Sequence, residues 1–125
     1  MVHLSKLQLI HNTQLNPSDI IHQRRITLID QLKIQQEMAE AMIERKRYTK
    51  LKVPPRQWYW QFEGIYYIHI FYDNKKLALK DGKSAVVVGS EIENLISTFG
   101  VLISAVEAGE LDEALKDACM LKYSH

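Results

Sequence analysis

Cysteine is nearly absent from this chain, and long apolar runs are missing altogether. The single cysteine, Cys119, excludes an internal disulfide and a cysteine-based zinc site, and its apolar surroundings predict a small buried residue. No apolar run approaches the roughly 18 residues of a membrane-spanning helix, and residues 1–12 lack the pattern of a signal peptide. With only three prolines and five glycines in 125 residues, the sequence predicts one globular, cytoplasmic domain.

Catalytic and metal-binding patterns are also lacking. The five histidines are scattered, and no two of them have the spacing of metal ligands on one helix. Gly82-Lys83-Ser84 looks like the end of a phosphate-binding loop, but Leu77 stands where the preceding glycine of that loop is required. We therefore predict no enzyme, no cofactor and no metal site.

The net charge of +1 hides an uneven distribution of charge. Residues 1–90 carry 14 Lys and Arg against 8 Asp and Glu, whereas residues 91–125 carry 2 against 7. Such clustered cations suit a phosphate backbone, although a solvated helix end followed by a linker has the same composition. The densest group places six cations in twelve residues without an acid: Arg45, Lys46, Arg47, Lys50, Lys52 and Arg56.

A long helix is predicted in the N-terminal part. Asn16-Pro17-Ser18-Asp19 combines a cap residue, a proline at the first helical position and an acid in the first turn. The helix should run over about 17–47, and its thin apolar stripe favours packing on little or on a partner chain. For residues 1–15 the sequence predicts a short strand or an extended arm. The stripe consists of Ile21, Leu28, Leu32, Ala39, Met42 and Ile43.

Residues 56–89 have the pattern of an antiparallel sheet. Alternating strands at 56–62 and 65–72 are joined by a two-residue turn at Glu63-Gly64. Further turns at Asp73-Asn74 and Asp81-Gly82 lead into strands at 76–80 and 84–88. The short loops predict a four-stranded meander.

The most regular apolar pattern follows the sheet. Ser90 and Glu93 have the spacing of a capping box, Gly109 should end or kink the helix, and a shorter helix should reach about residue 121. The predicted packing or dimer face comprises Ile92, Leu95, Ile96, Phe99, Gly100, Leu102, Ile103 and Val106. The fold class is α+β: a four-stranded antiparallel meander followed by an amphipathic helix, with a long N-terminal helix. The single domain, 1–125, divides into an arm and helix (1–52), the sheet (56–89) and the C-terminal helices (90–121).

Aromatic residues concentrate between residues 56 and 71, which include both tryptophans. The turn register puts six rings on one face of the hairpin: Trp58, Trp60, Phe62, Tyr67, His69 and Phe71. The other face carries Ile68 and Ile70, which with Leu77 and Leu79 suit the apolar helix. We expect the Trp-rich face to point to solvent, bordered by Arg56, Lys76, Lys80 and Lys83. A second core under the N-terminal helix or a partner is the alternative.

Exposed rings among cations are typical of surfaces that bind single-stranded nucleic acid, because bases stack on the rings while cations hold the phosphates. The leading hypothesis is therefore a small protein that binds single-stranded DNA, or RNA, on the Trp-rich face and the Arg45–Arg56 cluster. One alternative is a module that occupies a host protein, such as a nuclease, polymerase or defence complex, through that face or the acidic Glu91–Asp117 region. Another is a structural dimer whose rings are core.

Four segments resemble a family of small uncharacterised bacterial and phage proteins. They are the runs 82–90 (GKSAVVVGS) and 105–112 (AVEAGELD), Trp58-Tyr59-Trp60 and Gln23-Arg24-Arg25. The resemblance spans most of the chain. It implies a phage setting inside a bacterial host cell, and it carries no assigned activity or site residues.

The expected architecture is also similar to the single-stranded-DNA-binding transcriptional coactivator domain (positive cofactor four and its bacterial relatives) and to the Whirly proteins. That resemblance implies a homodimer formed by paired helices, with single strands bound on the sheet faces. Lys83, Trp58, Trp60 and Tyr67 would then lie in the binding region, and Gly100 on the pairing helix. The long N-terminal helix and the acidic last helix depart from this pattern.

Overall fold

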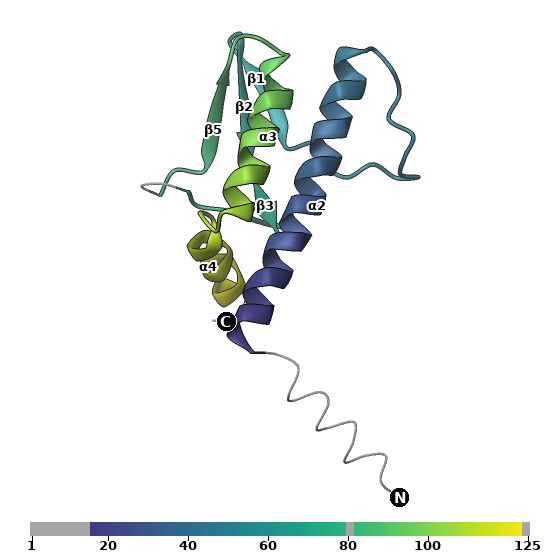
Figure 1. Cartoon of the computed structure of the whole chain (residues 1–125). Coiled ribbons are helices and arrows are strands. Elements are labelled where there is room, and N and C mark those ends of the chain that lie inside the picture. Colours follow the sequence, from purple (N-terminus) through teal and green to yellow (C-terminus); the bar gives the residue numbers. More distant parts are fainter. Residues whose placement is uncertain (1–15, 80–81, 124–125) are drawn as a thin grey trace, which may run out of the picture.

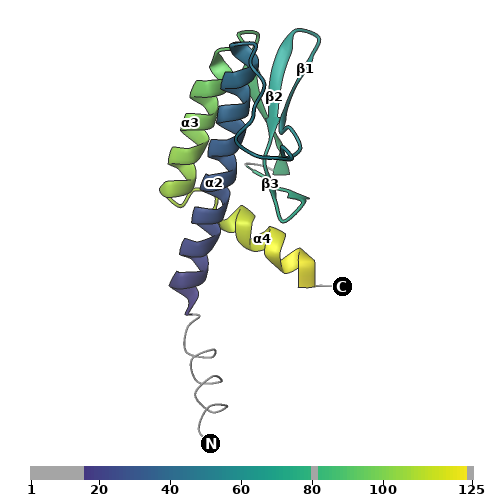
Figure 2. The same cartoon turned by 90° about the vertical axis from the view of Figure 1, so that its right-hand side faces the viewer.

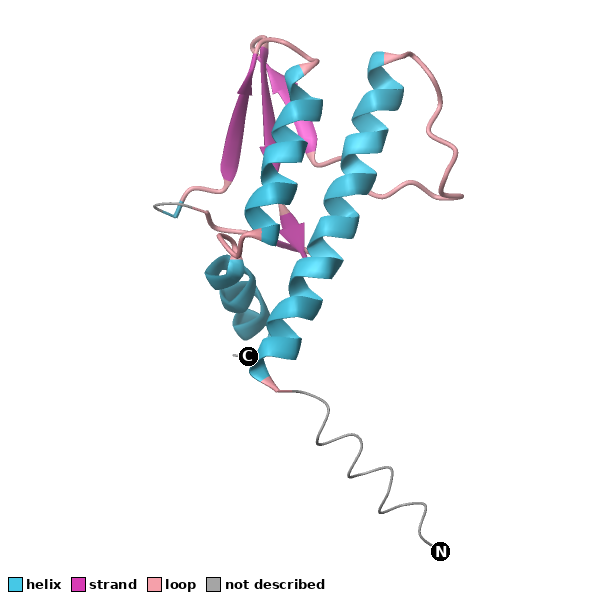
Figure 3. Cartoon of the chain, viewed as in Figure 1, coloured by secondary structure: helices cyan, strands magenta, loops and turns pink. Residues whose placement is uncertain are grey.

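A long helix, a small antiparallel sheet and two C-terminal helices form the described part of the chain (Figure 1). The computed structural model describes residues 16–79 and 82–123, so the expected arm at 1–15 lies outside it. The α+β class is confirmed, and Figure 3 distinguishes the helices from the strands by colour. The elements are α2 (Pro17–Ile43), β1 (Tyr59–Phe62), β2 (Ile65–His69), β3 (Phe71–Tyr72), β4 (Lys75–Lys76), β5 (Ala85–Gly89), α3 (Asn94–Glu107) and α4 (Asp112–Tyr123).

Helix α2 begins where the sequence predicts. The Asn16 side chain accepts a hydrogen bond of 3.0 Å from the Asp19 N–H, and Pro17 occupies the first helical position. The helix ends at Ile43, four residues before the predicted end. Arg45 adopts a left-handed conformation, and the Lys46 N–H returns to the Ala41 carbonyl at 2.8 Å. These bonds form a Schellman motif, which here has arginine in place of the usual glycine. The motif ends the helix well before Pro54, the first proline that would have stopped it.

Helices α2 and α3 lie side by side over one face of the sheet (Figure 2). The buried side of α2 is formed by Leu28, Leu32, Gln35 and Ala39. Gln36 donates a hydrogen bond of 2.9 Å to the Ile96 carbonyl, and a Cβ added at Gly100 would meet Gln36 Nε2 at 3.7 Å. The middle of the predicted stripe, Leu28, Leu32 and Ala39, is thus buried within the chain, whereas Met42 near the end of α2 is exposed. Gly100 lies where the two helices approach each other.

The first hairpin has the predicted register. Glu63 and Gly64 both have positive φ angles, as a two-residue hairpin turn requires, and Phe62 pairs with Ile65. Trp60 pairs with Tyr67, and the His69 N–H donates to the Trp58 carbonyl at 2.9 Å.

The prediction of a four-stranded meander is wrong. The sheet has three strands in the order β1-β2-β5, and β3 and β4 form a separate hairpin around Asp73-Asn74. The expected strand 76–80 is shorter than predicted, because β4 ends at Lys76 and only the Leu77 N–H, which bonds to the Ile70 carbonyl at 2.8 Å, continues the pairing. The Leu77 side chain lies in the core with an exposed fraction of 1%. The short hairpin leaves the edge of β2 free, and β5 pairs there instead.

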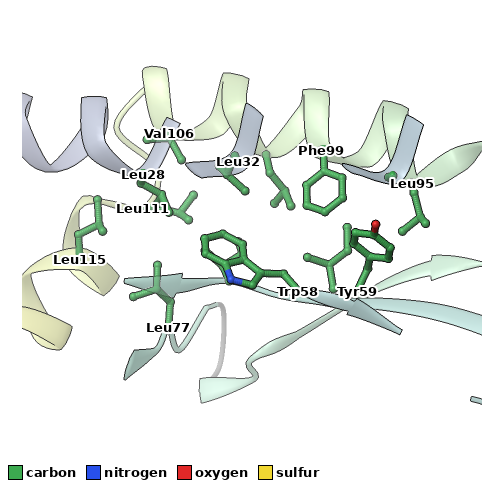
Figure 4. Packing of buried hydrophobic residues seen from close by; sticks show 14 of the residues in the cluster. Leu28, Leu32, Trp58, Tyr59, Leu77, Leu95, Phe99, Val106, Leu111 and Leu115 are labelled. Carbon is green, nitrogen blue, oxygen red and sulfur yellow. The ribbon is translucent and has the colours of Figure 1, made fainter. Parts of the chain in front are cut away.

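The hydrophobic core lies between the helices and the inner face of the sheet (Figure 4). Ile68 and Ile70 are fully buried, as are Leu95 and Phe99 of α3, which confirms the predicted pairing of the aliphatic face with the apolar helix. Tyr59 stands edge-on to Phe99 with ring centroids 5.9 Å apart, and burial raises the pKa of its hydroxyl to about 12.

The predicted capping box of α3 does not form. The helix begins at Asn94, and the preceding turn is closed by main-chain bonds such as Asn94 N–H to the Glu91 carbonyl, 3.1 Å. At the other end, Gly109 has a φ of 84° and closes α3 in a Schellman motif, as predicted. No single helix of the described ranges is long and apolar enough to cross a membrane, although α3 and Asp112–Cys119 reach that length and composition together across an 80° bend.

Helix α4 is joined to α2 by an ion pair. Arg25 Nε donates to Asp112 at 2.9 Å, and its second nitrogen bonds the other carboxylate oxygen. This bond lowers the pKa of Asp112, against an opposing effect of burial, and raises that of Arg25. The apolar contacts of α4 come from Leu111 just before the helix, Leu115 and Ala118, and Cys119 is partly buried rather than fully buried.

One buried amide connects α2 to the start of β1. Gln35, with an exposed fraction of 1%, donates from Nε2 to the Arg56 carbonyl at 2.8 Å. Its Oε1 accepts the Trp58 N–H at 2.9 Å. The side chain therefore satisfies the main chain on both sides of Gln57 and holds this segment against the helix.

Replacing Gln35 by leucine should destabilise the protein. In Gln35→Leu the shape is roughly kept, but the buried Trp58 N–H loses its acceptor, which costs about 1–3 kcal/mol of the free energy of unfolding. Urea denaturation of the variant measures this loss, with the exposed Gln23→Leu on the same helix as control. Equal stability of the two variants would contradict the role assigned to Gln35.

Candidate nucleic-acid interface

The outer face of the sheet, opposite α2 and α3, carries most of the predicted rings. In Figure 2 both helices lie on one side of β1 and β2, and no described helix lies over the other side. We use "aromatic face" for the four residues that β1 and β2 place there: Trp60, Phe62, Tyr67 and His69. Three of them are half-buried, and Phe62 has an exposed fraction of 59%.

Three rings of the aromatic face, those of Trp60, Tyr67 and His69, pack on one another. Trp60 stacks on its cross-strand partner Tyr67 with centroids 5.3 Å apart and planes inclined by 20°. His69, diagonally across from Trp60, lies 4.3 Å away. The edge-on contact of His69 with Phe71, at 6.1 Å, continues the row into β3. The rings therefore form one continuous row on the outer surface.

Trp58 was expected on this face, and that expectation is wrong. Its exposed fraction is 8%, and Figure 4 shows its ring among the buried residues between the helices and the strands. Trp58 and Tyr59 are both buried, although neighbouring residues of a regular strand point to opposite faces. The regular strand starts only at Tyr59, and the bonds from Gln35 hold the preceding residue against α2.

Two cations adjoin the row of rings, as predicted. The Arg56 guanidinium carbon lies 4.1 Å from the centre of the Phe71 ring, a cation–π contact. Lys76 pairs with Phe71 across the β3–β4 hairpin and is exposed. Lys83 is also exposed, just before β5, whereas Lys80 lies outside the described residues.

The basic segment 45–56 leads from the end of α2 to β1. All six of its cations are exposed. Two of them bind acids that the local sequence pattern did not reveal: Lys50 pairs with Glu37 of α2 at 2.9 Å, and Lys46 with Glu44 at 3.3 Å. The bond to Glu37 raises the pKa of Lys50. Within the described ranges, Arg45, Arg47 and Lys52 form no ion pair.

A cleft of about 480 Å³ separates this segment from α2. Ile34 of α2, Leu51 and Val53 of the segment, and the rings of Trp58 and Phe71 contribute its apolar lining. Val53 has an exposed fraction of 81%. The cleft runs from the basic segment to Phe71, at the end of the row of rings.

Sequence reasoning missed the contribution of β5. Val87 pairs with Tyr67 and Ala85 with His69, so both extend the outer surface beside the rings. Val87 has an exposed fraction of 67%. The three consecutive valines of β5 give no alternation from which the exposed one could be chosen.

The predicted packing helix serves the core of its own chain. Leu95, Phe99, Leu102 and Val106 are buried against α2 and the sheet. The remaining apolar members of that set, Ile92, Ile96 and Ile103, are partly buried against the same cluster. Pairing of helices through these residues would require the chain to open its core, so the predicted homodimer needs another surface.

No group of three or more His, Cys, Asp or Glu within the described ranges could hold a metal ion. No protein-family model matches the chain, and comparisons with curated proteins and with solved structures find no match. The resemblances drawn from the sequence therefore stay predictions, and the sheet order β1-β2-β5 departs from the meander on which the architectural one depended.

The imidazole of His69 should remain neutral at neutral pH. Partial burial, and secondarily the charge of Lys76, lower its pKa from the usual 6.5. An NMR titration of the histidine ring protons should give a midpoint below 6.5, and Lys76→Ala should raise it. A His69 midpoint above 6.5 would contradict the packing described for this ring.

Proposed function

We propose that this protein binds single-stranded nucleic acid, DNA or RNA, across the aromatic face, with phosphates held by cations of the basic segment. The observation that carries the proposal is a continuous row of rings on the sheet surface that α2 and α3 leave uncovered. Exposed aromatic side chains stack on any base, and this sequence-tolerant contact is typical of single-strand binders.

Phe62 and Arg56 mark the two ends where a strand could contact the row. Phe62 exposes 59% of its surface beside Trp60, so a base can stack there without displacing another ring. At the other end, the Arg56 guanidinium lies over Phe71. Its planar group can stack under a base while its nitrogens donate to a phosphate.

The basic segment supplies charge along the same path. Arg45, Arg47 and Lys52 are exposed and have no acidic partner in the described ranges, so their charges remain available to phosphates. Lys46 and Lys50 would have to exchange Glu44 and Glu37 for phosphate. We therefore expect the first three cations to contribute most to the salt dependence of binding.

A protein partner is the second candidate function. Phe62 of β1 and Val87 of β5 expose 59% and 67% of their surfaces on the same side of the sheet, one on each side of β2, and apolar groups exposed on one face also mark protein-binding surfaces. Such a module would bind a host protein through this face. Binding that resists high salt and ignores oligonucleotides would favour this function.

Removing the central ring should weaken nucleic-acid binding without unfolding the protein. For Trp60→Ala we expect the affinity for a fluorescently labelled single strand to fall by about 1–3 kcal/mol, because one stacked base is lost. Fluorescence anisotropy at low salt measures it. Ile26→Ala, an exposed apolar residue on α2, is the matched control and should bind as the unmodified chain does.

The salt dependence identifies the phosphate contacts. Each of Arg45→Gln, Arg47→Gln and Lys52→Gln should lower the slope of log affinity against log salt by about 0.7 if that residue holds one phosphate of a single strand. A duplex of the same sequence should bind more weakly than the single strand. Absence of binding to DNA and RNA strands at low salt, or equal binding by Trp60→Ala, refutes the proposed function.

A further inference from the structure

Strand β5 leaves one edge of the three-stranded sheet open. The His69 N–H bonds to β1, so the main-chain groups of the preceding Ile68 point to β5, where Val86 pairs with it. The N–H and C=O groups of Ala85 and Val87 then point away from the sheet. The pairing of β2 with β5 is irregular only between Tyr66 and Tyr67, that is, after Val87. Ala85 and Val87 therefore both lie in the regular part of the pairing.

The opposite edge of the sheet is partly closed. Because Trp58 bonds to His69, the main-chain groups of Tyr59 point outward from β1. The Gln57 side chain donates to the Tyr59 carbonyl at 2.9 Å and occupies this acceptor. Of the two outward residues of β1, Tyr59 and Gln61, the first therefore has its acceptor occupied, whereas no side chain is bonded to the outward groups of β5 in the described ranges.

Strand β5 lacks the usual protection of an exposed edge. Proteins commonly block such edges with charged residues or proline, and Ala85–Gly89 contains neither. Its residues are mostly valines, which favour strands, and Val87 is two-thirds exposed. A strand of this composition with free main-chain groups is suited to pair with another strand.

The sequence around β5 is complementary to itself. Residues 83–91 read KSAVVVGSE, so an antiparallel copy centred on Val87 places Val86 opposite Val88, and the regular pairing ends there because Gly89 pairs with Tyr66 across the irregularity. Beyond this point the end of β5 that follows Lys83 lies beside the end of the other copy that precedes Glu91, and both residues are exposed. Opposite charges brought close together twice favour a second copy of this chain over an unrelated strand.

We propose that β5 pairs antiparallel with β5 of a second copy around a two-fold axis at Val87, joining the two three-stranded sheets into one. The two Val87 residues exchange N–H···O=C bonds at the axis, and the Lys83 end of each strand lies beside the Glu91 end of the other. Because both copies contribute the same edge to the contact, the pairing is closed and the assembly stops at a dimer. This inference does not depend on nucleic-acid binding.

Helix α3 supplies a second contact beside the strand pair. Its Gly100 side faces α2, so Thr98, Val101 and Ala105 lie on the flank turned away from α2. In Figure 1, α3 lies between β5 and α2, which places this flank on the side of the open edge. Val101 exposes 66% of its surface, and small neighbours let two such helices approach across the axis.

Sedimentation velocity of the full chain over a range of concentrations tests the proposal. We expect a monomer–dimer equilibrium with a dissociation constant on the order of 10 µM, since interfaces below about 1,200 Å² are usually weak. Val87→Pro removes an N–H that points away from β2, so it should preserve the fold but abolish the dimer. Val87→Thr keeps the N–H and the branched shape, and should dimerise normally. If circular dichroism shows that the proline variant is unfolded, Val87→Lys replaces it, because it places two positive charges next to each other at the axis and should also prevent the dimer.

Charge reversal tests the antiparallel orientation of the two strands. Lys83→Glu should raise the dissociation constant about 3- to 30-fold at low salt, because two attractive pairs become repulsive. The double variant Lys83→Glu/Glu91→Lys should restore it to the unmodified value. A chain that stays monomeric at several hundred micromolar, a folded Val87→Pro or Val87→Lys variant that still dimerises, or a double variant no better than the single one, overturns the proposal.

Discussion

The hydrogen bonds of Gln35 are the constraint on which the candidate site depends. This buried amide binds the main chain at Arg56 and Trp58, and so determines where the segment after the basic loop meets α2. With Trp58 held inward, the regular strand begins at Tyr59. From that point the alternation of β1 sends Tyr59 to the core and Trp60 to the outer surface. A helix side chain thereby sets which rings meet solvent.

The same constraint links the basic segment to the rings. Because the main chain of Arg56 is bound to α2, its side chain extends over Phe71 instead of moving with the loop before it. Charge from the end of α2 and rings from the hairpin thus meet at one place, beside the cleft lined by Leu51 and Val53. Neither group alone would distinguish a ligand surface from a solvated loop or a second core.

Local chemistry made much of the fold predictable. The Asn16 cap, the Glu63-Gly64 turn and the end of α3 at Gly109 each depend on a few adjacent residues, and all are confirmed. The aliphatic face of the sheet followed from the turn register. The early end of α2 at Ile43 could not be predicted, because Arg45 takes the left-handed position that glycine usually occupies.

Features that depend on distant residues were not predictable. The burial of Trp58 requires Gln35, which lies 23 residues earlier and reads as one more polar residue of a long helix. The pairing of β5 with β2 depends on how Ile70 and Leu77 fill the core, and no turn signal records that. For the candidate site, the outward rings and the adjoining cations were foreseen, whereas Val87 and the acids that pair with Lys46 and Lys50 were not.

Two variants with one tryptophan each test the account most directly, by fluorescence with acrylamide as quencher. In Trp60→Phe only Trp58 emits, and a buried indole should give blue-shifted emission that acrylamide quenches weakly. In Trp58→Phe only Trp60 emits, and its half-exposed ring should give red-shifted emission that acrylamide quenches more strongly. The reverse order, or identical emission and quenching of the two indoles, would contradict the division of the hairpin into an inward Trp58 and an outward Trp60.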